Sequence, residues 1–159
     1  IITYMTVAGG AGGGGALFGN GIAGGGAGGF REAKKDILNS KVLLLGVTYK
    51  PNVKDIQLSP VEDIIKKLLE LNVDVKIYDP YFKSETVFGI KTENDFVKAI
   101  HEVDAIIIST AHQEFHDLEP TFLAPRMKTP IVIDSRGVMD PYLSKKAGLI
   151  FRGLGRGKF

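Results

Sequence analysis

One connection in this chain of 159 residues contains more charged and aromatic side chains than a simple turn requires. Residues 46–60 read GVTYKPNVKDIQLSP, between an apolar run and an amphipathic pattern. Lys50 directly follows Tyr49 there, and a second cation, Arg136, lies far along the chain in the segment DSRGVMD. Lysine is a point cation and arginine a planar fork of donors, and both bind phosphate groups. Lys50 and Arg136 therefore indicate a site for a phosphorylated ligand.

The elements that would position these cations alternate from residue 40 onward. Apolar runs predict strands, and apolar residues repeated three and four positions apart predict helices. The predicted strands are 41–48, 73–80, 104–110, 130–137 and 149–155. Helical patterns lie between them at 59–72, 92–103 and 140–148, with a short helix or turn at 122–127.

Two helix starts have local sequence signals. Ser59 is a candidate cap, Pro60 suits the first turn, and Glu62 completes an S-x-x-E capping box. Thr92 is the expected cap of the helix over 92–103. Gly148 should close the helix over 140–148.

This rhythm predicts an α/β domain with a three-layer, Rossmann-like architecture. The sheet should be mostly parallel, with helices on both faces. Ligands of such sheets bind beyond the carboxyl ends of the strands. The segments expected there are GVTYKPN, YDPYF, STAHQEF and DSRGVMD. Lys50 and Arg136 both belong to this set.

Composition excludes several classes of function. A net charge of +2 without a Lys/Arg cluster argues against a nucleic-acid partner. The absence of cysteine excludes disulfides and a cysteine nucleophile in this chain, and it suits a cytoplasmic location. His112 and His116 are spaced as in zinc helices, but Gln113 replaces the required glutamate and a third ligand is missing. We therefore expect no metal site, and a polar loop with Phe115 packed inward.

The first 30 residues differ from the rest, with no charged residue and 13 of the 20 glycines. A G-x-G-x-x-G match at Gly10, Gly12 and Gly15 follows from this composition and lacks a preceding strand, so we assign it no cofactor. Neither a signal peptide nor a membrane span is expected. We divide the chain into a Gly-rich segment with a short linker helix, 1–38, and an α/β domain, 39–159.

Four segments carry a resemblance to a known family. LLLGVTYKPNVKDIQLSP, VKIYDPY, AIIISTAHQEF and IDSRGVMD occur in an order that resembles the C-terminal domain of the UDP-glucose/GDP-mannose dehydrogenase family. Within that family, residues 31–159 are most similar to UDP-N-acetyl-D-mannosamine dehydrogenases. The resemblance implies that residues 39–159 are a nucleotide-sugar-binding domain and that residues 1–38 are the exit from a central helical region.

The resemblance also implies an activity for the parent enzyme. Such enzymes oxidise the C6 alcohol of UDP-N-acetyl-D-mannosamine or UDP-glucose to the uronate in two NAD-dependent steps. NAD and the catalytic cysteine belong mainly to other domains, so we expect this chain alone to be inactive, with no catalytic residue of its own. The implied partners are a UDP-sugar and further copies of the enzyme, as a homodimer or higher homo-oligomer.

Four residues match substrate-binding positions of the family. Tyr49 and Lys50 match the aromatic–lysine pair of the nucleotide-sugar loop, and Arg136 matches an arginine that reaches the nucleotide sugar. Asp55 matches the acid of the D-x-R-x-S-P motif and is expected to orient the loop. The sequence departs from this motif at Gln57, where arginine is usual.

Two non-catalytic alternatives remain at this stage. A signalling domain of the response-regulator type would need a phosphorylatable aspartate, for which Asp134 is the candidate, although the first strand ends without acids. An oligomerisation module with a vestigial loop is the other alternative. Ligand binding separates the oligomerisation module from a nucleotide-sugar site.

Overall fold

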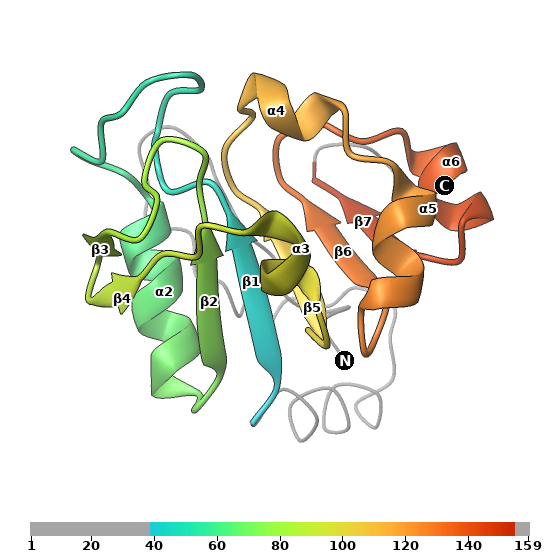
Figure 1. The fold of residues 1–159 in the computed structure, drawn as a ribbon, viewed down its shortest axis with the longest axis horizontal. Helices are drawn as coiled ribbons and strands as arrows, with labels where there is room; N and C mark the ends of the chain where they lie inside the picture. The colour runs from blue at the N-terminus through green and yellow to red at the C-terminus, as the bar shows by residue number, and fades with distance from the viewer. Residues whose placement is uncertain (1–38, 155–159) are drawn as a thin grey trace.

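The structure is a computed structural model that describes residues 39–154. The expected linker helix and the Gly-rich match of residues 1–38 lie outside these residues, as do residues 155–159. Figure 1 shows one sheet with helices packed against it.

Five parallel strands form the sheet, as the apolar runs predict. They are β1 (Lys41–Leu45), β2 (Asp74–Tyr78), β5 (Ala105–Ile108), β6 (Ile131–Asp134) and β7 (Ile150–Gly153). Their spatial order is β2-β1-β5-β6-β7, and every neighbouring pair is parallel. The central strands β1, β5 and β6 are buried almost throughout, which explains why their sequences are continuously apolar.

Helices cover both faces, and alternate strand residues enter separate cores. The helices are α2 (Val61–Glu70), α3 (Phe96–Ile100), α4 (Gln113–His116), α5 (Pro120–Leu123), the 3₁₀ helix η2 (Ala124–Arg126) and α6 (Pro141–Lys146). Val42 and Leu44 pack with α2, whereas Leu43 and Leu45 pack with α3, α4 and α5. None of these helices is long and apolar enough to cross a bilayer.

The segment between β2 and β5 differs from the prediction. A small hairpin, β3 (Thr86–Val87) and β4 (Ile90–Lys91), was not expected; Phe88 and Gly89 join its strands and both have positive φ. This is the pattern of a type I′ turn.

The predicted cap at Thr92 is wrong. The Thr92 hydroxyl bonds to the backbone of Glu85 beside the hairpin, and α3 begins later. Asp95 is the cap instead, because its carboxylate accepts the Lys98 N–H at 3.1 Å. The hydrogen bonds beside the hairpin thus outweigh the preference of Thr92 for a helix cap.

The capping box at the start of α2 is also wrong. The Ser59 hydroxyl donates to the Val47 carbonyl at 2.7 Å and accepts the Val61 N–H at 3.3 Å. Glu62 does not reach back to Ser59 and pairs with Lys66 at 3.0 Å. Ser59 therefore ties the end of segment 46–60 to its beginning.

Candidate functional site

From β1 the chain continues to β2 on one side of the sheet, and the later strands β5, β6 and β7 lie on the other side of β1. The order of the strands therefore reverses beside β1. Open parallel sheets bind ligands at such a switch point, beyond the carboxyl ends of the strands. The connection 46–60 leaves β1 there, and residues 109–112 leave β5. Figure 1 shows the loop after β1 and helix α4 beyond this end of the sheet.

Gly46 allows the two connections to approach closely. Its φ is +89°, and a Cβ at this position would lie 2.5 Å from Thr110 Oγ1. Only glycine fits such a position without displacing the neighbour. The approach lets the Thr110 hydroxyl donate to the Thr48 carbonyl at 2.7 Å.

A fully buried pair, Asp79 and His112, lies at the centre of the switch point. Asp79 Oδ2 accepts the Val47 N–H at 2.9 Å and lies 3.0 Å from His112 Nε2. The other oxygen, Oδ1, accepts the Tyr81 N–H at 2.8 Å. Both side chains are 0% exposed, so the pair joins the connections after β1, β2 and β5 without contacting solvent.

The hydrogen bonds assign the tautomer of His112. Its Nδ1 accepts the Asn52 N–H at 2.9 Å, so the ring proton belongs on Nε2, which donates to Asp79. Asn52 also accepts the Gln113 N–H through its side-chain oxygen at 2.8 Å. Segment 46–60 is therefore held on residues that follow β5.

Tyr49 and Lys50 project from this anchored base, as a binding role requires. Tyr49 is 47% exposed, and Lys50 is also exposed. The Thr48 hydroxyl donates to the Lys50 carbonyl at 2.6 Å, which shapes the turn at that residue. Within residues 39–154, the Lys50 ammonium has no hydrogen-bond or ion-pair partner, whereas Lys54 pairs with Glu85 at 2.5 Å.

Asp55 lies further along the same connection and is exposed. Its Oδ1 accepts the Gln57 N–H at 2.9 Å, which forms a local turn within the connection. Gln57 itself is exposed, and Leu58 is 98% exposed with a φ of +55°.

Arg136 reaches the same end of the sheet from β6. Buried Asp134 orders its loop by accepting N–H groups of Arg136, Gly137 and Met139 at 2.8–2.9 Å. The Arg136 guanidinium is exposed and without a partner in the described part of the chain. Strand β5 lies between β1 and β6, so the strands bearing Lys50 and Arg136 are about 10 Å apart. The two cations flank one region and are not in contact.

Asp134 does not suit the signalling alternative. The side chain is 0% exposed, and three backbone N–H groups occupy its two oxygens. A phosphorylatable aspartate must present an oxygen to its phosphodonor. The role of Asp134 is instead to order the loop that carries Arg136.

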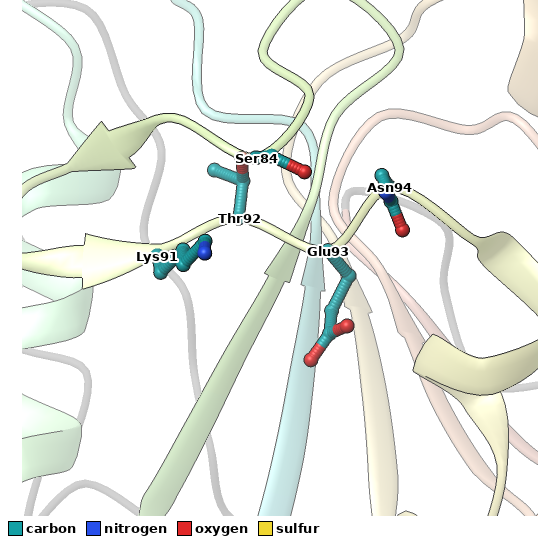
Figure 2. A pocket seen from close by; sticks show the side chains of 5 residues that line it. All are labelled: Ser84, Lys91, Thr92, Glu93 and Asn94. Carbon is teal, nitrogen blue, oxygen red and sulfur yellow. The ribbon is translucent and has the colours of Figure 1, made fainter.

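Two other polar features lie apart from the four predicted binding residues. Residues 39–154 contain no group of three potential metal ligands, and His116 is exposed while His112 is bound to Asp79. A polar hollow of about 340 Å³ lies beside the hairpin. Figure 2 shows the side chains that line it, Ser84, Lys91, Thr92, Glu93 and Asn94. None of the four predicted binding residues lines it.

Tyr78, the last residue of β2, packs against Phe96 and Phe115. Burial, reinforced by the nearby carboxylates of Glu114 and Asp79, raises the pKa of its phenol above the ordinary value. Tyr78 therefore stays protonated at neutral pH and serves packing rather than proton transfer.

Comparison with known proteins gives the family. The model of the UDP-glucose/GDP-mannose dehydrogenase family, UDP binding domain, matches residues 43–141, more than half of the chain. The chain belongs to this family. The resemblance read from the four sequence segments is thereby confirmed, and residues 43–141 are a UDP-binding domain.

The relatives of this UDP-binding domain are named for two different substrates. The chain is 33% identical over 128 residues to UDP-N-acetyl-D-mannosamine dehydrogenase of Methanocaldococcus jannaschii, covering 79% of this chain and 29% of that protein. It is 32% identical over 125 residues to UDP-glucose 6-dehydrogenase of Rickettsia conorii, covering 76% and 29%. The solved UDP-D-ManNAc dehydrogenase of Pyrococcus horikoshii superposes with a TM-score of 0.66 at 29% identity, covering 82% of this chain and 30% of that one.

The chain spans less than a third of the length of these relatives. The fold prediction is confirmed, because the present structure has a parallel sheet with helices on both faces and superposes on the solved dehydrogenase with a TM-score of 0.66.

Sequence reasoning missed the buried residues beneath the site. Asp79, His112 and Asp134 were placed at the carboxyl ends of strands, but none was given this structural role. The available signal was their position, because a polar residue that ends a buried strand must find partners in neighbouring loops.

Proposed function

We propose that this chain is the C-terminal, UDP-sugar-binding domain of an NAD-dependent nucleotide-sugar 6-dehydrogenase. The observation that carries this proposal is the pair of exposed cations, Lys50 and Arg136, beyond the carboxyl ends of β1 and β6. Neither side chain has a hydrogen-bond or ion-pair partner among residues 39–154. Family membership supports it, and relatives named for UDP-N-acetyl-D-mannosamine and for UDP-glucose define the two candidate substrates.

Each exposed residue has a distinct role in this proposal. Lys50 neutralises charge on the diphosphate, and Arg136 contacts the nucleotide sugar through its planar fork of donors. The half-exposed ring of Tyr49 packs against the ligand beside Lys50. Asp55 keeps the loop in shape through its turn with Gln57.

Oxidation itself belongs to other parts of the parent enzyme. This chain contains no cysteine to hold the intermediate aldehyde. Residues 39–154 also do not fit NAD, because the connection from β1 to α2 contains a single glycine, Gly46, where a dinucleotide fingerprint needs three. We therefore assign NAD to a domain outside this chain and expect no dehydrogenase activity from the chain alone.

Calorimetric titration of the 159-residue chain with UDP, UDP-N-acetyl-D-mannosamine, UDP-glucose and ADP tests the proposal. A partial site binds weakly, so ligand concentrations should reach the millimolar range. We expect binding of all three uridine ligands, weaker binding of ADP, and a loss of about tenfold in affinity for Lys50→Ala, since one charge-assisted contact is removed.

Lys67→Ala is the matched control. Lys67 is an exposed lysine in the last turn of α2, at the opposite end of the sheet, in a surface pair with Glu70. Its removal changes the net charge equally but should leave affinity unchanged. An equal loss in both variants would reduce the effect to long-range charge, and no binding of any uridine ligand by the folded chain would refute the proposed function.

A further inference from the structure

The Asp79–His112 pair has a polar contact for every available atom. Asp79 binds two backbone N–H groups and the His112 ring, and the second ring nitrogen accepts the Asn52 N–H. Among described residues, no buried side-chain nitrogen or oxygen lacks a partner. Burying a carboxylate and an imidazole removes both from water, and their hydrogen bonds must first offset that cost. Stability alone therefore does not account for the pair.

The pair instead determines the course of a short exposed segment. Thr48 and Asn52 are fixed at its two ends, and Tyr49 and Lys50 project between them. At one end, Thr48 accepts from Thr110 and donates to the Lys50 carbonyl. At the other, His112 holds Asn52 in a left-handed conformation with φ +60°. Without the Nδ1 acceptor, the Asn52 N–H loses its partner, and this end of the segment is held less firmly, by the bond from the Gln113 N–H to the Asn52 side chain.

We propose that His112 and Thr48 are positioning residues that set the affinity for the nucleotide sugar by holding segment 48–52. Neither side chain reaches solvent, since His112 is 0% and Thr48 1% exposed, so they act through Tyr49 and Lys50. This inference rests on the proposed function, because it takes those two residues as ligand contacts.

Two substitutions at His112 separate positioning from stability. In His112→Asn, the amide oxygen can take the place of Nδ1 and accept the Asn52 N–H, but nothing reaches Asp79. In His112→Gln, the amide nitrogen can take the place of Nε2–H and donate to Asp79, but the Asn52 N–H has no acceptor. The two variants therefore break different halves of one network.

We expect His112→Gln to lose more affinity for UDP and His112→Asn to lose more stability. His112→Gln should bind UDP about tenfold more weakly than wild type while keeping most of its stability. His112→Asn should bind within about threefold of wild type but unfold at a lower denaturant concentration, since Asp79 loses a donor. Titration calorimetry and urea unfolding of the 159-residue chain measure the two quantities. A purely structural role would make affinity follow stability in both.

Thr48→Val and Leu123→Val complete the test. Thr48→Val is nearly isosteric and removes the hydroxyl, which donates to the Lys50 carbonyl and lies 3.5 Å from His112 Nε2, so binding should weaken about fivefold. This variant still tests the proposal if a His112 variant fails to fold. Leu123, the buried last residue of α5, lies in the core between that helix and the sheet, so Leu123→Val is a control for simple destabilisation and should leave affinity unchanged. If wild type binds UDP and Lys50→Ala weakens binding, but Thr48→Val and His112→Gln bind as wild type, the positioning inference is wrong and the proposed function stands. If wild type does not bind, both are wrong.

Discussion

The two ends of the parallel sheet are built differently, although the same strands meet at both. Beyond the carboxyl ends, buried polar side chains hold long loops; they are Thr48, Ser59, Asp79, Ser109, Thr110, His112 and Asp134. At the amino end, turns are short and the main polar anchor is Asp104, which accepts the Lys41 N–H at 2.8 Å and the Thr129 hydroxyl at 3.2 Å.

We infer from this difference that the carboxyl end of the sheet serves function and the amino end serves stability. The amino end needs only to start the strands in register, and the partly exposed carboxylate of Asp104 contributes to this by bonding to the first residue of β1. The carboxyl end must hold exposed cations on loops that have no regular hydrogen bonding of their own. Buried polar groups supply fixed partners for those loops, because each unsatisfied group would cost free energy in the interior.

The largest expected effect is at Gly46, with Gly148 as its counterpart. Both have φ near +90°, but a Cβ at Gly46 would collide with Thr110, whereas a Cβ at Gly148 meets nothing within 4 Å. Gly46→Ala should lower the free energy of unfolding by about 3 kcal/mol or more, from strain and overpacking together. Gly148→Ala carries only the strain, about 1 kcal/mol. Urea denaturation of both variants measures the difference; similar losses would contradict the close packing at the carboxyl end.

A smaller effect is expected from neutralising the aspartate at each end. Asp134→Asn should cost about 2–3 kcal/mol, because three backbone N–H groups then share one oxygen and an NH₂ group. Asp104→Asn should cost about 1 kcal/mol or less, since an amide can still accept from Lys41 and donate to Thr129. Thermal and urea unfolding at neutral pH test both, and an Asp104 variant at least as unstable as the Asp134 variant would reverse the comparison.

The smallest effect, of opposite sign, is expected at Leu58. This leucine is 98% exposed with φ +55°, so it has strain without burial. Asn72, at the amino end, has the same φ of 55° with a residue type that tolerates it. Leu58→Asn should therefore stabilise the chain by about 0.5–1 kcal/mol. The reverse exchange, Asn72→Leu, should destabilise it by a similar amount, and differential scanning calorimetry of both resolves the signs.

Much of the fold follows from the sequence because its signals are local. The apolar runs at 41–48 and 104–110 are strands of a parallel sheet, and the amphipathic stretch after Pro60 is α2. The position of Lys50 at the carboxyl end followed from the same alternation, since parallel strands all end on one side.

The errors arose where a polar side chain in a local motif forms its hydrogen bond with a residue outside that motif. Thr92 has the side chain of a cap but bonds to Glu85 across the hairpin. Ser59 begins a capping-box pattern, yet its hydroxyl donates to Val47, twelve residues away. A polar side chain takes the best partner in the folded chain, and sequence spacing does not specify that partner.

The sequence by itself determined the α/β class, the parallel sheet, the family and the end of the sheet where Tyr49, Lys50 and Arg136 lie. Hydrophobic periodicity and linked motifs depend only on neighbouring residues, so they can be read without coordinates. The tertiary structure alone decided the strand order and the switch point beside β1. It also showed that Asp79 and His112 join loops 33 residues apart, because a buried polar pair is defined by the partners that folding brings together.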